Sequence, residues 1–212
     1  CEQFIEIGAG HGYFTKLFLK YNNPSRTVIC DISKTSLEMT KSIISETSNI
    51  SNITFINKNF LELDVNNKYD FLIMGEVLEH VYDPVKFIKC ARDYINSNGK
   101  IFISTCANCA QEDHLYRFNN INEIKNMILA NNLIIEDDLI CSSEDIDKDS
   151  WEKEKIAVNY CAILKKWNID MKKVKIAFVR NYTIEPFLSI IRKILLEKKF
   201  ETEFFITGYD DY

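Results

Sequence analysis

Residues 6–12 read EIGAGHG, a glycine-rich turn that follows directly on the apolar run Phe4–Ile7. Glycine adopts positive φ at little steric cost and lets a ligand approach the backbone closely. Tyr13–Lys20 continues with apolar residues at helical spacing, so the turn joins a short buried strand to a helix. The N-terminus of a helix behind such a turn favours anionic groups, which indicates a nucleotide-type ligand.

The spacing of the glycines separates two classes of such ligand. A dinucleotide fingerprint, Gly-x-Gly-x-x-Gly, would place its third small residue at position 13, which is Tyr13. The third glycine comes one residue early, at Gly12. Asp31 closes the next apolar strand, Thr27–Cys30, and a carboxylate there can accept hydrogen bonds from both hydroxyls of a ribose. Capping of the helix from Ser33 is the alternative role for Asp31; behind this turn we favour ribose binding.

Strands and helices alternate over most of the chain. We expect further strands at Ile53–Asn57, Tyr69–Met74, Lys100–Thr105, Leu133–Glu136 and Ala157–Lys165. We expect further helices at Ser33–Glu46, Leu78–Ile95 and Asn122–Asn131, with Pro84 near a break or in a first turn, a turn at Asn96–Gly99, and an exposed loop or helix at Asp137–Lys155. The alternation predicts an α/β, Rossmann-like fold: a seven-stranded, mainly parallel sheet with helices on both faces. Such sheets bind ligands at the carboxyl ends of their strands.

We expect residues 1–166 to form the first domain, 167–173 a linker, and 174–212 the start of a second α/β domain. The last segment contains a strand at Val174–Val179, a helix from Thr183 to Lys199 and a strand at Glu203–Thr207, which make one β-α-β unit. So short a unit buries too little surface to fold alone, so we expect it to be incomplete. Strand-like sequence also begins almost at Cys1, and we expect the chain to be a piece of a longer polypeptide.

Composition excludes several classes of protein. Of the 212 residues 46% are hydrophobic, which is normal for a packed globular protein. The sequence has no run of about 18 apolar residues, the length that a membrane-spanning helix needs. The net charge of −5 argues against broad binding to nucleic acid or to anionic membranes. Seven cysteines, an odd number in a chain of this length, indicate reduced thiols and a cytoplasmic location.

Four motifs, in order, resemble the class I S-adenosylmethionine-dependent methyltransferases of the ubiquinone-biosynthesis and small-molecule type. They are EIGAGHG at 6–12, VICDIS at 28–33, Tyr69-Asp70 leading into EVLEHV at 76–81, and Asn98-Gly99-Lys100 before the fifth strand. The resemblance covers about residues 3–165, and it implies S-adenosylmethionine as the cofactor and methyl transfer as the reaction. The family's lid helix, which precedes the first strand, is missing from this chain.

The resemblance also implies which residues hold the cofactor. Its methionine part would face the turn, formed by Gly8, Ala9, Gly10 and Gly12, while Glu6 would support the ammonium group. Asp31 would bind the ribose, and Ile32 would pack on the adenine. Asn59-Phe60 stands where the family often has an aspartate that contacts the adenine amine, and an amide oxygen can still accept from that amine. The backbone near Gly75 and Glu76 would border the sulfonium.

Transfer to a hydroxyl also needs a base with a pKa near neutrality. The chain has three histidines, and all fall near the expected carboxyl edge. His114 is our first candidate for the base and His80 the second; His80 comes four residues after Glu76, so the two would share a helical face. A helix-capping or packing role is equally open for His80, and His11 is expected to shape the turn. Cys106-Ala107-Asn108-Cys109 is a lone Cys-x-x-Cys, and we expect no metal.

Residues 172–212 resemble the opening of FkbH-like proteins, which act on carrier-bound three-carbon units. We therefore expect a small or carrier-bound acceptor, methylated at oxygen, in a biosynthetic pathway of carbohydrates, polyketides or other secondary metabolites, with further domains in the parent chain and no nucleic-acid or membrane partner. A non-catalytic cofactor-binding scaffold is the alternative, because of Asn59 and the missing lid. A nicotinamide-dependent oxidoreductase is disfavoured by Tyr13.

Overall fold

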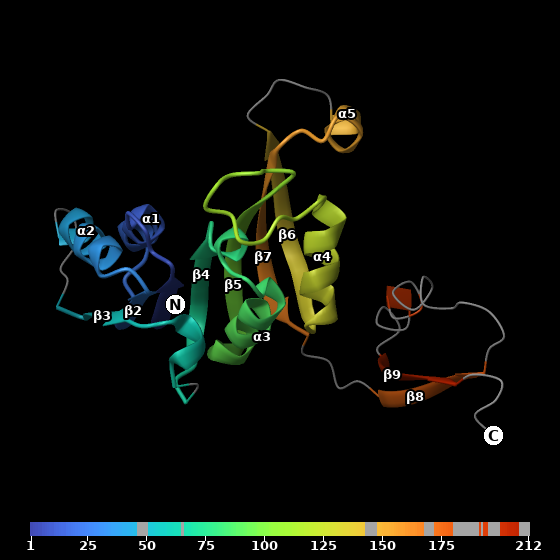
Figure 1. Ribbon diagram of the computed structural model, residues 1–212. Helices are drawn as coiled ribbons and strands as arrows, with labels where there is room; N and C mark the ends of the chain where they lie inside the picture. Colours follow the sequence, from blue (N-terminus) through green and yellow to red (C-terminus); the bar gives the residue numbers. More distant parts are fainter. Residues whose placement is uncertain are drawn as a thin grey trace. The chain divides into compact units, whose positions relative to one another are not determined.

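The computed structural model describes residues 1–45, 51–64, 66–142, 148–167, 172–179, 191, 193–194 and 200–207 (Figure 1). The chain divides into two compact units, Cys1–Trp167 and Asn168–Tyr212. The first contains a seven-stranded sheet, and the second contains a separate pair of strands. Within the described ranges, no helix has the length and apolar character that crossing a bilayer requires.

The sheet of the first unit has the strand order β3-β2-β1-β4-β5-β7-β6. Its strands are β1 (Gln3–Ile7), β2 (Arg26–Asp31), β3 (Ile53–Asn57), β4 (Tyr69–Gly75), β5 (Ile95–Ala107), β6 (Leu133–Ser142) and β7 (Val158–Lys166). The pairs from β3 across to β5 are parallel, whereas β7 runs antiparallel to both of its neighbours. The predicted Rossmann-like, mainly parallel sheet is therefore confirmed.

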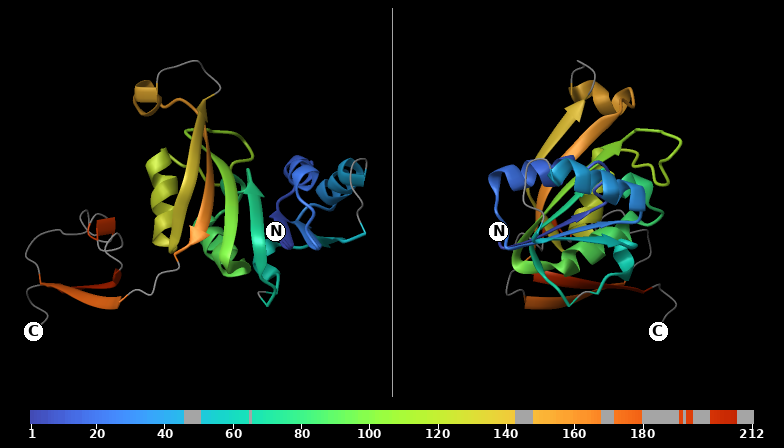
Figure 2. Two further views of the ribbon diagram at one scale, coloured as in Figure 1. Left: turned by 180° about the vertical axis from the view of Figure 1, so that it is seen from behind. Right: turned by 90° about the vertical axis from the view of Figure 1, so that its left-hand side faces the viewer.

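Helices cover both faces of the sheet. α1 (Tyr13–Tyr21) and α2 (Lys34–Ser45) pack together on one face, and α3 (Pro84–Tyr94) and α4 (Ile121–Ala130) pack together on the other (Figures 1 and 2). Each face has its own apolar core. The smaller core, beneath α1 and α2, is made of Ala9, Ile29, Leu37 and Ile44; the larger lies beneath α3 and α4 and includes Leu72, Ile88, Ile101 and Ile128.

The helix predicted over Leu78–Ile95 is wrong in its first part. The structure has a 3₁₀ turn, η2 (Leu78–His80), and α3 then starts at Pro84. Proline fits the first turn of a helix but disfavours helical backbone at the residue before it. Asp83 caps α3, because its side chain accepts a hydrogen bond from the amide of Lys86 at 2.9 Å. Pro84 therefore marks the beginning of the helix.

Two segments predicted as turn or loop are strand instead. β5 begins at Ile95 and includes Asn96–Gly99, with a register shift against β4 between Tyr69 and Phe71. β6 extends to Ser142, so the first part of Asp137–Lys155 pairs with β7, and α5 (Lys148–Lys153) follows. Polar residues in both segments suggested a turn or a loop. In the structure these segments pair with neighbouring strands, and ion pairs such as that of Lys125 with Asp138, at 2.6 Å, stabilise them in the sheet.

In the second unit, β8 (Lys172–Val179) pairs parallel with β9 (Phe200–Thr207). The helix expected from Thr183 to Lys199 lies mostly outside the described residues. The resemblance of this segment to FkbH-like proteins stays a prediction.

Candidate functional site

A cleft of about 730 Å³ opens at the carboxyl edge of the sheet. It lies where the strand order reverses, because the chain builds β2 and β3 on one side of β1 and then returns to place β4 on the other. Ligands of doubly wound sheets bind at this switch point. The predicted site residues that line the cleft are Gly8, Gly10, Asp31, Ile32, Asn59, Phe60, Glu76 and His80.

The three glycines of the turn have positive φ, of 69°, 53° and 75°, but each has a different surrounding. A Cβ on Gly8 would lie 2.5 Å from Val77 Cγ2, and a Cβ on Gly12 would lie 2.7 Å from Thr40 Cγ2. A Cβ on Gly10 would meet nothing within 4 Å. Gly8 and Gly12 therefore allow close packing of the chain, whereas Gly10 presents bare backbone to open space in the cleft.

Asp31 holds the glycine turn and still faces the cleft. Its Oδ2 accepts a hydrogen bond from the amide of Gly10 at 3.1 Å, and its Oδ1 accepts one from the amide of Ser33 at 2.7 Å. Each oxygen of an ionised carboxylate has a second acceptor site. The buried carboxylate of Asp31 can therefore accept two more hydrogen bonds from a ligand.

The adenine side of the cleft combines an exposed side chain with core residues. Ile32 is 74% exposed, although its neighbour Asp31 is buried. Asn59 caps the short 3₁₀ helix η1 (Phe60–Glu62), because its Oδ1 accepts from the amide of Leu61 at 3.0 Å. The ring of Phe60 belongs to the larger core and packs against Phe87 and Tyr94.

Four predicted cofactor residues do not line the cleft, namely Glu6, Ala9, Gly12 and Gly75. Glu6 is buried and its carboxyl accepts a hydrogen bond from the hydroxyl of Thr15 in α1. Burial raises the pKa of Glu6 to about 8, and the nearby charge of Asp31 adds to this effect. Gly75 leaves room for Phe14, whose ring would lie 2.3 Å from an added Cβ. These four residues therefore support the segments that line the cleft without lining it themselves.

Glu76 and His80 both line the cleft, but they do not share a helical face as predicted. Glu76 has φ of 51°, in the left-handed region, and the 3₁₀ turn η2 begins after it. The amide of Glu76 donates to the carbonyl of Ser104 at 2.9 Å and contacts the Ser104 hydroxyl at 3.2 Å. These contacts from β5 hold Glu76 in a conformation that a non-glycine residue seldom adopts.

The two candidate bases are neighbours. The ring centroids of His80 and His114 are 5.1 Å apart, edge to face. His80 Nδ1 lies 3.0 Å from the carbonyl oxygen of Asp113, and His114 Nδ1 lies 3.1 Å from that of Cys109. His80 lines the cleft, whereas His114 is not among the lining residues.

Sequence reasoning missed Glu79, which connects η2 with the loop after β5. Its buried carboxyl accepts a hydrogen bond from the hydroxyl of Thr105 at 2.7 Å, and burial raises its pKa to about 7. Its main-chain carbonyl accepts from the amides of Leu115 and Tyr116 at 2.8 and 2.9 Å. The loop after β5 is thus tied to η2.

Other missed residues of the cleft come from the segment around η2 and α3. They are Val77, Val81, Tyr82, Asp83, Lys86 and Phe87. Tyr82 is 82% exposed. An exposed aromatic residue beside apolar ones is a signal that could have found this wall, but most of the segment was predicted as helix, with Pro84 near a break or in a first turn.

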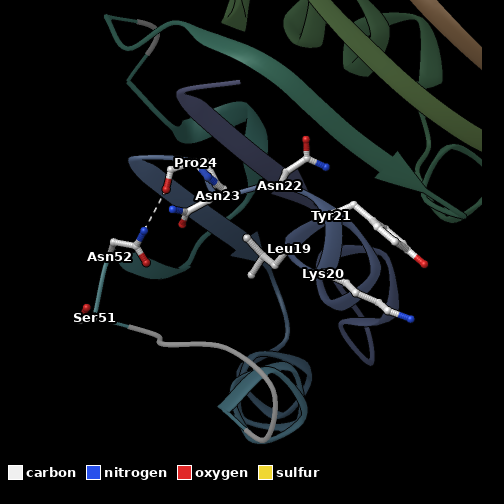
Figure 3. A pocket seen from close by; sticks show the side chains of 8 residues that line it. All are labelled: Leu19, Lys20, Tyr21, Asn22, Asn23, Pro24, Ser51 and Asn52. Carbon is white, nitrogen blue, oxygen red and sulfur yellow. Dashed lines mark hydrogen bonds between the residues drawn. The ribbon is translucent and has the colours of Figure 1, made fainter.

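A second hollow, of about 590 Å³, lies at the opposite edge of the sheet (Figure 3). It is formed by the end of α1 and the segments that lead into β2 and β3, and Asn52 Nδ2 donates to the carbonyl of Pro24 at 2.9 Å across it. This edge carries the amino ends of the parallel strands. The first cleft is therefore the better candidate for a cofactor site.

Residues 2–177 match a protein family described as "Methyltransferase domain". The chain belongs to this methyltransferase family. Membership confirms the expected class of enzyme and S-adenosylmethionine as the cofactor of that class. A search of curated protein sequences finds no match.

Solved structures show the same fold at low sequence identity. N-methyltransferase NodS from Bradyrhizobium japonicum WM9, in complex with S-adenosylhomocysteine, is 15% identical with a TM-score of 0.61, over 79% of either chain. The O-methyltransferase of a trans-AT polyketide synthase multienzyme from Brevibacillus brevis, in complex with the same compound, is 15% identical with a TM-score of 0.62, over 78% of this chain and 66% of that one. The [4+2]-cyclase SpnF is 12% identical with a TM-score of 0.61, over 77% and 74%. At such identities the likeness shows the fold alone.

Proposed function

We propose that this methyltransferase transfers a methyl group from S-adenosylmethionine, bound in the carboxyl-edge cleft, to an oxygen of a small or carrier-bound metabolite. The observation that carries the proposal is the meeting of Gly10, Asp31 and Ile32 in one cleft. Gly10 offers bare backbone to the amino-acid part of the cofactor. Asp31 offers two acceptor sites to the ribose, and Ile32 offers an exposed apolar surface to the purine.

In this proposal the ribose hydroxyls donate to the two free acceptor sites of Asp31. Ile32 covers one face of the adenine, and Asn59 Oδ1, which already accepts from Leu61, accepts from the adenine amine through its second lone pair. The methionine part passes over Gly10. Glu6 supports the glycine turn from behind, since its carboxyl accepts a hydrogen bond from the hydroxyl of Thr15.

Methyl transfer from a sulfonium needs little covalent help from the protein, because the cofactor is already activated. The protein brings the acceptor within about 3–3.5 Å and in line with the methyl group. A hydroxyl acceptor must also lose its proton, and His80 is placed to take it because it lines the cleft beside Glu76. His114, the first candidate from sequence, does not line the cleft.

The type of acceptor is supported less directly than the cofactor site is. The chain is acidic, with a net charge of −5, which disfavours nucleic acid. One structural neighbour is the O-methyltransferase of a trans-AT polyketide synthase multienzyme. A biosynthetic role with a small or carrier-bound acceptor, in the cytoplasm, is consistent with both and with the predicted multidomain parent.

Calorimetry with S-adenosylhomocysteine tests the cofactor site. Asp31→Ala removes two hydrogen bonds to a charged acceptor, each worth roughly 1.5–3 kcal/mol, so affinity should fall by roughly 10²–10⁴-fold. Asp70→Ala is the matched control. Asp70 Oδ2 also accepts from two backbone amides, those of Glu2 and Gln3 at 2.9 Å, but at the amino edge of the sheet.

The control variant should lose stability and keep its affinity. Equal affinity of the Asp31 variant and the Asp70 variant would refute the ribose role. Tight binding of NAD without binding of S-adenosylhomocysteine would refute the cofactor assignment of the cleft. Binding with no turnover across a broad panel of hydroxyl acceptors, measured on the full-length parent protein, would favour the scaffold alternative.

A further inference from the structure

Two cysteines and a histidine come together beside the cleft. The ligand atoms of Cys106, Cys109 and His114 all lie within 4.8 Å of one another, and Cys106 Sγ is 3.9 Å from His114 Nδ1. Tetrahedral zinc, with Zn–S of about 2.3 Å and Zn–N of about 2.0 Å, would hold such atoms roughly 3.5–3.8 Å apart. A closure of at most about 1.3 Å would bring the three side chains to coordinating distance.

We propose that Cys106, Cys109 and His114 bind a thiophilic divalent cation, Zn²⁺ above all. Binding would form two metal–thiolate bonds and one metal–imidazole bond, and would release the two thiol protons to solvent. To coordinate through Nδ1, His114 would give up its hydrogen bond to the carbonyl of Cys109, and the ring proton would move to Nε2. Two thiolates and an imidazole are ligands that select zinc over magnesium or calcium.

The backbone favours this grouping. Cys106 is buried at the end of β5, and Asn108 next turns the chain with φ of 57°, a left-handed conformation that asparagine tolerates. The amide of Asn108 donates to the carbonyl of Phe118 at 2.8 Å, which closes the loop on itself. The turn brings Cys109 back toward Cys106, and the same loop returns His114 to both.

A fourth ligand can come from Glu79, whereas His80 stays the base of the proposed reaction. These two residues and His114 form a second group whose ligand atoms lie within 4.8 Å of one another. When His80 Nδ1 donates its proton to the carbonyl of Asp113, 3.0 Å away, Nε2 is left unprotonated. This unprotonated nitrogen is the one that can take a proton from the acceptor, so the metal group and the base remain separate.

The proposal changes two expectations from the sequence. A lone Cys-x-x-Cys predicted no metal, because a zinc site needs two more ligands and only His114 is close in the sequence; the fold adds Glu79 nearby. His114 is assigned to the metal in place of proton transfer. All seven cysteines are free in the structure, so the thiols of this group are available.

Metal reconstitution of the full chain, without cofactor or acceptor, tests the proposal. The purified chain is stripped with a chelator under reducing conditions and loaded with Zn²⁺ or Co²⁺. We expect one retained equivalent per chain, a thiolate-to-cobalt charge-transfer band, and protection of two thiols from alkylation by Zn²⁺. Cys109→Ser and His114→Ala should weaken zinc binding by roughly tenfold or more.

Cys90→Ser is the matched control, because Cys90 is a half-buried thiol on α3 outside the group. It should retain zinc as the unaltered chain does. Since Cys106 is buried, its substitution risks the fold; the half-buried Cys109 and the protection of thiols in the unaltered chain therefore carry the test. Calorimetry with S-adenosylhomocysteine on Cys109→Ser, expected to be unchanged, separates this proposal from the cofactor site.

Three results would each overturn the proposal. The chain fails to retain a stoichiometric metal ion after reconstitution. Cys109→Ser binds zinc as tightly as Cys90→Ser does. Mass spectrometry of the chain, purified without reductant, finds Cys106 and Cys109 joined as a disulfide that, after reduction, still takes no metal.

Discussion

Replacing Gly10 or Gly12 with alanine should separate cofactor binding from folding. Both glycines have left-handed φ, 53° and 75°, which costs a residue with a Cβ roughly 1–2 kcal/mol. In Gly10→Ala the new methyl group meets nothing within 4 Å, so that cost is the main loss. For a domain of this size, the melting temperature should fall by about 2–8 °C.

The methyl group of Gly10→Ala enters the space that we assign to the cofactor. Overpacking of this kind costs roughly 1–3 kcal/mol, so affinity for S-adenosylhomocysteine should fall by roughly 5- to 150-fold. In Gly12→Ala the Cβ would lie 2.7 Å from Thr40 Cγ2 and 3.0 Å from Thr40 Cα. That clash adds roughly 1–3 kcal/mol to the loss of folding stability.

Thermal unfolding without ligand and calorimetry with S-adenosylhomocysteine check both variants. Gly12→Ala should be the less stable of the two, and Gly10→Ala should be the variant that folds and binds poorly. Unchanged affinity of Gly10→Ala would show that the cofactor does not pass over this glycine, and the reasoning from the open space would fail.

Three further changes test other walls of the cleft. Burial raises the pKa of Glu6 to about 8, so between its ordinary value of 4.5 and about 8 the folded chain holds a proton that the unfolded chain has lost. Stability should therefore fall as pH rises through this range; Glu6→Gln should remove that part of the slope in urea midpoints, and parallel curves would contradict it. Phe60→Ala should destabilise by roughly 3–5 kcal/mol in the same assay, because its ring is buried in the larger core. Ile32→Ser should change stability by less than about 0.5 kcal/mol yet weaken S-adenosylhomocysteine binding; wild-type affinity would remove Ile32 from the adenine site.

The sequence was most informative where local chemistry and fold agree. The turn at Gly8, Gly10 and Gly12 needs positive φ that glycine provides, and apolar runs before it and before Asp31 predict parallel strands whose ends meet. These short-range signals predicted the turn and the mainly parallel sheet, whereas the strand order and the hydrogen bond from the Gly10 amide to Asp31 come from the structure.

Other features depend on residues far apart in the chain, and no local pattern reports them. Glu76 adopts left-handed backbone because Ser104, on a neighbouring strand, holds its amide. The burial of Glu6 depends on the docking of α1, whose Thr15 hydroxyl donates to its carboxyl. The approach of His114 to Cys106 depends on how the loop after β5 returns.

The main-chain carbonyl oxygen of Glu79 accepts hydrogen bonds from the amides of both Leu115 and Tyr116. This backbone clasp joins η2 and the loop after β5, which are distant in the sequence, into one wall. Because backbone atoms form this clasp, it tolerates exchange of the side chains on the returning loop. An engineer who wants a new acceptor can therefore randomise exposed positions of that loop, such as Leu115 and Arg117, while the main-chain clasp keeps the wall in place. Shortening or lengthening the loop would instead shift the clasp and disturb the cofactor pocket next to it.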